Sequence, residues 1–121
     1  MYILLIMNEQ IHQPNTAQLA EIEATCACAN VRKAARAVTQ LFDEVLQPTG
    51  LRSTQFTLLV AVARLGEAPV TRLAERGRQA LASALPYWEQ AQHQVVERLG
   101  HEQWQALRAS LQATMTLAQP L

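Results

Sequence analysis

The stretch from Gly50 to Arg78, GLRSTQFTLLVAVARLGEAPVTRLAERGR, is the most informative part of the sequence for the fold. Its first part predicts a helix, a Gly-Glu-Ala-Pro turn and the start of a second short helix, which is how a helix-turn-helix DNA reader begins. A complete reader needs a further turn, a recognition helix and, in winged versions, a hairpin. After Glu75 the chain instead continues directly into a long amphipathic helix. The stretch therefore indicates descent from a helix-turn-helix protein more clearly than it indicates a working DNA-binding activity.

Length and composition favour one domain that carries little net charge. The chain has 121 residues, of which 50% are hydrophobic and 17% charged, so it can supply a core. Ten basic and ten acidic residues cancel, and the pI of about 6.8 lies well below the value above about 9 that marks a DNA-binding domain. Between residues 31 and 78, however, eight basic residues face four acidic ones. This local excess indicates either a weak phosphate-facing surface or solvated helix faces.

The N-terminal apolar run does not resemble a membrane or export segment. Residues 1–6 are too few to span a bilayer, and they have neither a basic leader nor a small-residue cleavage site. We therefore expect a cytoplasmic protein.

Apolar spacing predicts helices in the first half of the chain. Asn15 and Gln18 have capping-box spacing at the start of a first helix. A second helix, over 31–46, repeats apolar residues every three or four positions, and Pro48 and Gly50 end it. No strand pattern is present.

The next predicted helix is apolar on two faces. Ser53 is a suitable N-cap, and few polar positions lie between it and Leu65, so we expect this helix to be largely buried. Gly66 is expected at its C-cap, and Pro69 opens a short helix over 71–76.

Two amphipathic helices are predicted at the C-terminal end. From Arg78 to Leu99 the apolar spacing alternates between four and three, which is typical of a packing seam. Pro86 lies inside this helix and is expected to kink it. Gly100 breaks the chain before the last helix. Two helices joined by a tight break form an antiparallel hairpin or a partner-binding pair.

Three parts of the sequence resemble one protein family. Residues 26–44, CACANVRKAARAVTQLFDE, and residues 50–59, GLRSTQFTLL, look like the first two helices of MarR-type (multiple antibiotic resistance regulator) transcription factors. Residues 77–117 look like the last two helices of that family. The resemblance implies a dimeric winged helix-turn-helix. In that family the terminal helices build the dimer, the central lobe reads palindromic DNA, and small aromatic or phenolic effectors often bind between the lobes.

The sequence departs from this family in the segment that reads DNA, here called the reading head. Between the Leu-Ala-Glu at 73–75 and the Gly-Arg at 77–78, the family carries a recognition helix and a two-stranded wing, which are missing here. At about 11 residues for a helix and about 5 for each strand, a few tens of residues are absent. The expected fold is all-α, a truncated winged helix-turn-helix with long C-terminal dimerisation helices. We expect a single domain over 1–121, with a flexible 1–15, N-terminal helices over 16–47, a partial helix-turn-helix over 53–76 and dimerisation helices over 78–119.

The candidate site residues follow from this resemblance and from the apolar stripes. Contacts to the DNA backbone are expected from Ser53, Thr54, Thr71 and Arg72. The dimer interface is expected to use Leu85, Trp88, Val95, Trp104, Leu107, Leu111 and Met115. Phe56 and Trp88 are the expected lining of an effector pocket. Because the lobe that would form the other wall is truncated, we expect no affinity tighter than millimolar for salicylate-like phenolics.

No catalytic or metal-binding pattern is present. Cys26 and Cys28 are two residues apart, so on a helix at about 100° per residue they point to nearly opposite sides and share neither a metal nor a disulfide. His12, His93 and His101 stand alone in the sequence. We expect no enzyme activity, cofactor or metal. Reduced thiols are expected in the cytosol, with peroxide sensing by an exposed thiol as the alternative.

Two classes of function remain. The first is a MarR-like transcriptional regulator by lineage whose specific DNA reading is impaired, because the recognition helix delivers side chains to the base edges. The second is an interaction protein, a dimerisation remnant that pairs with a full-length paralogue and leaves it one reading head. A non-functional deletion product is the third possibility. For the chain alone we expect a homodimer, with a monomeric bundle as the alternative and no membrane partner.

Overall fold

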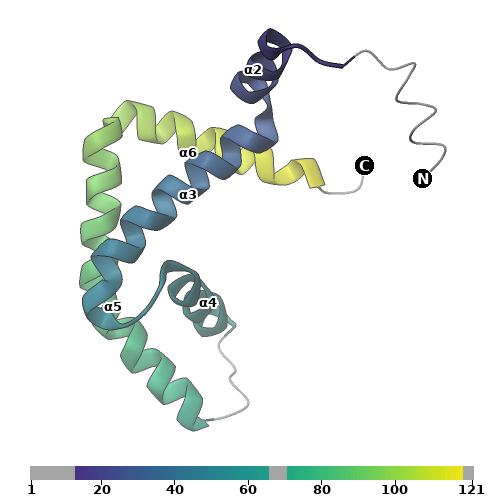
Figure 1. The fold of residues 1–121 in the computed structure, drawn as a ribbon. Coiled ribbons are helices and arrows are strands. Elements are labelled where there is room, and N and C mark those ends of the chain that lie inside the picture. The colour runs from purple at the N-terminus through teal and green to yellow at the C-terminus, as the bar shows by residue number, and fades with distance from the viewer. Residues whose placement is uncertain (1–12, 66–70, 119–121) are drawn as a thin grey trace, which may run out of the picture. The chain divides into compact units, whose positions relative to one another are not determined.

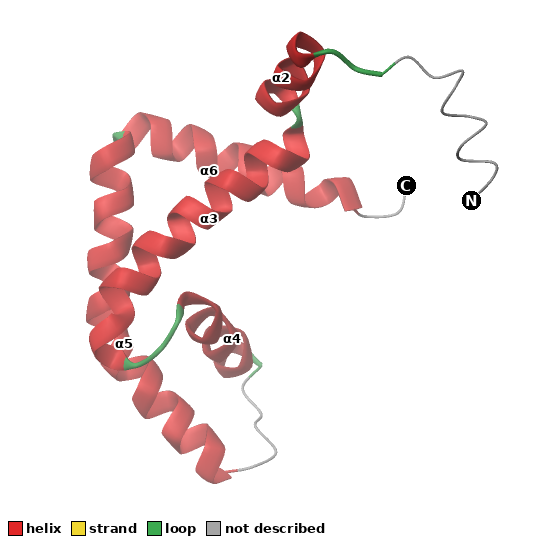
Figure 2. Cartoon of the chain, in the orientation of Figure 1, coloured by secondary structure: helices red, strands yellow, loops and turns green. Residues whose placement is uncertain are grey.

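The computed structural model describes residues 13–65 and 71–118, and these residues form helices and no strand (Figure 1, Figure 2). The helices are α2 (Thr16–Thr25), α3 (Ala27–Leu46), α4 (Ser53–Arg64), α5 (Thr71–Leu99) and α6 (His101–Met115). Two short 3-10 helices, η1 (Gln47–Thr49) and η2 (Thr116–Ala118), follow α3 and α6. The predicted all-α class is confirmed. The chain forms two compact units, Met1–Arg36 and Ala37–Leu121.

The first unit begins with the predicted capping box. The backbone N–H of Gln18 donates to Oδ1 of Asn15 over 2.8 Å, and the backbone N–H of Asn15 donates to Oε1 of Gln18 over 2.9 Å. These two bonds satisfy amides that have no partner inside α2. The helix buries none of its residues. It ends at Thr25 with Cys26 as its C-cap, and α3 begins at the residue after Cys26. Cys26 and Cys28 therefore do not share one helix, and that part of the prediction is wrong.

The turn after α3 sets the direction in which α4 starts. As predicted, α3 stops before Pro48, which lies in η1, and Gly50 follows with a left-handed φ of 77° that a side chain would strain. The Thr49 hydroxyl donates to the Leu46 carbonyl over 2.6 Å and accepts from the Leu51 N–H over 3.1 Å. These side-chain bonds replace the helical ones that Pro48 and Gly50 end.

The start of α4 differs from the prediction by one residue. Arg52 is the N-cap, and its N–H donates to Oε1 of Gln55 over 2.9 Å. Ser53, the predicted N-cap, is instead the first helical residue. The predicted stop and restart at Gly66 and Pro69 lie outside the described residues.

The expectation that α4 is largely buried is wrong. Phe56 is its one buried residue, whereas Leu58, Val62 and Leu65 are 64%, 43% and 76% exposed. One face of α4 contacts α5, and among the described residues nothing covers the opposite apolar face. The sequence showed two apolar faces but not the number of elements available to cover them.

The core of the second unit is small. Leu46, Phe56 and Ala84 are buried together. The partly buried residues packed against them are Leu51, Val60, Leu81, Tyr87 and Trp88. A buried Leu or Phe contributes about 1.5–3 kcal/mol, so Leu46 and Phe56 supply much of the apolar stabilisation. The fourth buried residue is Ala91.

The long helix α5 is continuous. The sequence predicted a short helix over 71–76 and a separate one from Arg78, and this division is wrong, because α5 runs through Gly77 and through Pro86. Gly77 has no positive φ. A Cβ at Gly77 would lie 3.4 Å from Cδ2 of Leu59 on α4, an ordinary van der Waals distance, so the packing of the two helices leaves room for a side chain of one carbon there.

The break between α5 and α6 occurs at the predicted residue. Gly100 has a φ of 89°, its N–H donates to the Val96 carbonyl over 2.8 Å, and its carbonyl accepts from the Trp104 N–H over 2.9 Å. The two helices meet at a sharp corner there (Figure 1).

Replacing Gly77 by alanine tests the continuity of α5. Because glycine in a helix interior costs about 0.5–1 kcal/mol relative to alanine, and the added Cβ meets only an ordinary contact at 3.4 Å, we expect Gly77→Ala to raise the free energy of unfolding by about that amount. Gly100→Ala is the control and should lower it, since φ is positive there. Urea titrations followed by circular dichroism measure both. A loss of stability in Gly77→Ala would contradict a helical Gly77.

Candidate functional site

A pocket of about 340 Å³ lies among the C-terminal half of α3, the first turns of α4 and the middle of α5. Its lining residues are Val38, Thr39, Phe42, Ser53, Thr54, Phe56, Thr57 and Trp88. The volume falls at the lower end of the range for small-molecule sites, about 300–1,000 Å³. None of the lining side chains is charged, so the pocket suits a small neutral molecule.

The structure brings the two predicted pocket residues together. The rings of Phe56 and Trp88 stack with centroids 6.4 Å apart and planes 18° from parallel. Phe56 is buried and Trp88 is half-buried, so the stack joins the core to the pocket wall. Offset stacking of this kind adds about 0.5–1.5 kcal/mol beyond the buried area. Trp88 thus has a partner inside its own chain, although the sequence also assigned it to the dimer interface.

The pocket rim is polar and open to solvent. The lining includes four residues with hydroxyl groups, Thr39, Ser53, Thr54 and Thr57, and the Thr57 hydroxyl donates to the Thr54 carbonyl over 3.0 Å. Thr54 and Thr57 are exposed. The aromatic floor can stack a ring, and the rim hydroxyls can hydrogen-bond a polar substituent.

Beside the pocket, Asp43 connects α3 to α4. The Ser53 N–H donates to Oδ1 of Asp43 over 2.7 Å. This backbone bond lowers the pKa of Asp43 below its ordinary value of 3.8; desolvation opposes the shift, and the Ser53 hydroxyl and the Arg52 charge support it. The sequence reading missed this pairing. An acidic residue in the last turns of a helix is unfavourable for the helix dipole, and that was the available signal.

The four predicted DNA contacts lie at two helix starts. Ser53 is half-buried and Thr54 is exposed in the first turn of α4. The Ser53 amide already pairs with a carboxylate. Thr71 and Arg72 begin α5, and their side chains lie outside the described part. That these residues contact a DNA backbone stays a prediction.

The predicted interface residues form incompletely covered apolar faces. On α6, Trp104 is half-buried, and Leu107, Leu111 and Met115 are 37%, 38% and 71% exposed. Their spacing of three and four puts them on one face. The helix buries none of its residues.

On α5 the predicted interface residues are covered to different degrees. Leu85 is 44% exposed, while Trp88 and Val95 are half-buried. Leu85 is thus the most exposed of the three, and Trp88 packs against the core cluster.

The remaining reactive side chains do not cluster. Cys26 is half-buried and Cys28 exposed, both as free thiols. His93 Nε2 lies 2.9 Å from Glu97 Oε1 one turn along α5, with both side chains exposed, and His12 lies outside the described residues. In the described part of the chain, no three His, Cys, Asp or Glu residues are grouped to hold a metal ion. No described helix is both long and apolar enough to cross a bilayer.

Comparisons of this chain with protein-family models, with curated proteins and with solved structures find no match. The resemblance to MarR-type regulators therefore rests on the sequence stretches quoted above.

Removing the Asp43 carboxylate should destabilise the fold in a pH-dependent way. Because the pKa of Asp43 is lowered on folding, its charge stabilises the folded state above pH 3.8, and this contribution is lost as the pH falls through the folded-state pKa. We expect Asp43→Ala to lose about 0.5–1 kcal/mol at pH 7, the lower part of the range for caps, since the site is partly exposed. The exposed neighbour Glu44 supplies the control, Glu44→Gln, which should change little. Equal stability of Asp43→Ala and wild type at pH 7 would show that the hydrogen bond from the Ser53 N–H to Asp43 does not stabilise the fold.

Salicylate tests the pocket. The pocket is open to solvent, and its lining has no cation to pair with the carboxylate of salicylate. We therefore expect salicylate to bind no more tightly than millimolar in isothermal titration calorimetry. Micromolar binding would contradict this expectation. If it occurs, Val38→Asp should abolish it, because Val38 lines the pocket, and Val31→Asp on the same helix is the matched control outside it.

Proposed function

We propose that this chain is a helical dimerisation module of MarR-type lineage, which acts by pairing through α5 and α6 and no longer reads a DNA sequence. The observation that carries the proposal is the apolar face of α6. Three of its large apolar residues, Leu107, Leu111 and Met115, are at least 37% exposed, and the helix buries no residue. Contiguous exposed apolar surface on a protein usually marks an interaction site.

The composition of this face fits a second copy of the same chain. The four face residues Trp104, Leu107, Leu111 and Met115 are uncharged. Glu102 lies on the far side of the helix, and Arg108, one turn after Trp104, borders the face. A two-fold contact places the same patch on both sides, so a charge-free apolar patch is self-complementary. Leu85 on α5 adds exposed apolar surface beyond the Gly100 corner.

A full-length paralogue is the second partner that this face can accept. A relative with the same terminal helices would offer a matching face, and the mixed dimer would carry one reading head. Such a dimer loses the affinity gained from two half-sites. The present chain would then act as an inhibitor of that relative.

Loss of specific DNA reading is supported by the course of the chain after Thr71. The helix α5 runs from there to Leu99 without interruption, and the described residues contain no strand for a wing. Base edges in the major groove are read by side chains of an inserted element. The exposed arginines Arg52, Arg64, Arg76 and Arg78 remain available for weak, salt-sensitive contacts to phosphates.

A charge on the α6 face should separate the dimer. We expect wild type at twice the 13.4 kDa of one chain in light scattering and Leu111→Glu at one mass, because each substitution places an unpaired charge on both sides of a two-fold contact. Ala109→Glu is the matched control: it adds the same charge to the same helix on the opposite face, and should stay at twice the mass.

Circular dichroism confirms that both variants remain helical. Two results would contradict the proposed interface, namely Leu111→Glu keeping the mass of wild type, or Ala109→Glu losing it equally.

Selection from a randomised duplex library tests DNA reading. We expect no enriched half-site, and any retained DNA should dissociate as salt rises, since phosphate contacts weaken steeply with ionic strength. A palindromic motif that binds at physiological salt more tightly than its scrambled duplex, by the factor of about 1,000 or more typical of specific readers, would refute the loss of reading.

A further inference from the structure

The break between α2 and α3 is held by side chains rather than by a helix-breaking residue. Cys26 alone leaves the helical conformation, with φ −63° and ψ 116°. Residues 16–46 contain no glycine or proline, so nothing in the local sequence prevents one unbroken helix.

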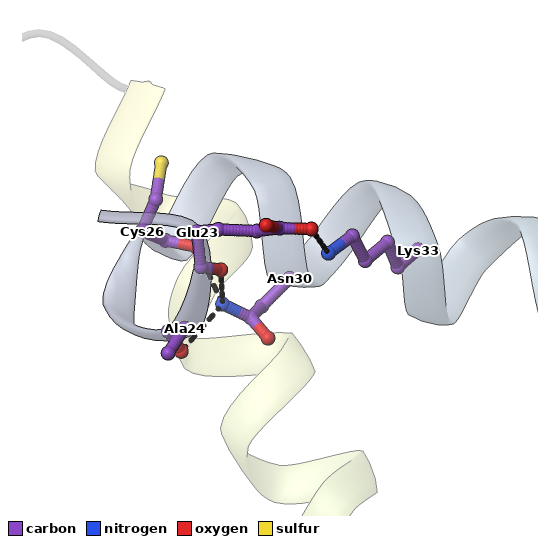
Figure 3. A network of polar contacts seen from close by, with 5 residues as sticks. All are labelled: Glu23, Ala24, Cys26, Asn30 and Lys33. Atoms are coloured by element: carbon purple, nitrogen blue, oxygen red, sulfur yellow. Dashed lines mark hydrogen bonds and ion pairs between the residues drawn. The ribbon is translucent and has the colours of Figure 1, made fainter. Parts of the chain in front are cut away.

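Asn30 supplies the main contact across the break (Figure 3). Its Nδ2 donates to the carbonyls of Cys26 over 2.8 Å, of Ala24 over 3.1 Å and, more weakly, of Glu23 over 3.5 Å. The last carbonyls of a helix have no partner inside it. The Asn30 amide therefore takes the place of backbone donors at the end of α2.

Two of these contacts and one ion pair cannot exist in a continuous helix. Residues 23 and 30 would lie about 10 Å apart along the axis, and residues 23 and 33 about 15 Å apart. In the structure Lys33 Nζ nevertheless lies 3.2 Å from Glu23 Oε1, and the Asn30 amide reaches the Ala24 carbonyl. The Thr25 hydroxyl also bonds back to the Glu21 carbonyl over 2.7 Å, a contact that tends to bend helices.

A continuous helix would gain backbone hydrogen bonds in place of the side-chain contacts that it would lose. It would pair the amides of Ala27, Cys28 and Ala29, which begin α3 and have no helical partner there, with the carbonyls four residues earlier. The contacts it would lose are mostly exposed. An exposed ion pair contributes little to stability. The two forms thus exchange one set of hydrogen bonds for another of similar size.

We propose that residues 16–46 exchange between the broken form and one continuous helix, and that the Asn30 amide holds the broken form. The exchange changes the apolar surface offered to a partner. In a continuous helix, Leu19 and Ile22 would lie about 100° and 160° around the axis from Val38. Leu19 and Ile22 are 53% and 57% exposed. A partner that covers either arrangement selects that form, because a ligand shifts an equilibrium by its differential affinity for the two states.

Distances between two spin labels, measured by pulsed electron paramagnetic resonance on the full-length chain, test the exchange. Cys26→Ser and Cys28→Ser remove the native thiols, and Ala20→Cys and Arg36→Cys place labels at two exposed positions. A small fraction of labelled chain is mixed with excess unlabelled chain, so that distances arise within one molecule. A continuous helix separates these two Cα atoms by about 24 Å, and the broken form gives a shorter distance.

We expect the labelled parent to show mainly the shorter distance and Asn30→Ala to gain a component near that of the continuous helix. In Lys33→Ala the distribution of distances should shift in the same direction, but by less. Arg32→Ala, an exposed neighbour outside this network, is the matched control and should leave the distribution of the parent unchanged. Three outcomes would overturn the proposal: an unchanged distribution in Asn30→Ala, an equal shift in Arg32→Ala, or a broad distribution with no long component and a loss of helical circular dichroism.

Discussion

The helices of this chain have more apolar surface than its small core can bury. Four apolar residues of the described part, Leu46, Phe56, Ala84 and Ala91, are buried, while half of the sequence is hydrophobic. Apolar surface left in water forfeits about 25 cal/mol per Å² that burial would return. The described helices therefore carry apolar faces that no other described residue covers, and the proposed dimer would cover the face of α6.

The small core is nevertheless well positioned by a few polar contacts. Thr49 closes the turn after α3 through two bonds, and the Asp43 carboxylate fixes the first amide of α4. With α4 held in this way, Phe56 stacks on Trp88 and the pocket forms beside the pair. The same few residues therefore define both the core and the pocket. Loss of the bond between Asp43 and the Ser53 amide should alter both.

Local signals were sufficient for much of the fold. The capping box of Asn15, the end of α3 at Pro48 and the corner at Gly100 each depend on residues within one turn, so the sequence predicted them. Gly77 was misread as a break because glycine is compatible with both a helix interior and a turn, and its neighbours in the sequence do not distinguish the two. The burial of α4 was overestimated because the pattern shows which faces are apolar, not what covers them. Ser53 was misplaced because its amide partner lies ten residues earlier.

The candidate site was predicted in part. The sequence identified Phe56 and Trp88 by residue type, but the threonines of α3 and α4 that line the pocket are brought together by the course of the chain, which no spacing shows. The apolar residues of the α6 face were visible in the sequence, since their period of three and four is local. That a second copy covers this face stays a proposal.

Amide hydrogen exchange of α6 tests whether a second copy covers this face. In a single chain α6 has no buried residue, so its amides should exchange rapidly through local opening. If a second copy covers the face, we expect amides of His101–Met115 to exchange slowly in wild type and rapidly in Leu111→Glu, at concentrations where wild type has twice the mass of one chain. The first turns of α4 should be unchanged between the two. Rapid exchange of α6 in both proteins would show that the apolar face stays in water and would contradict the account.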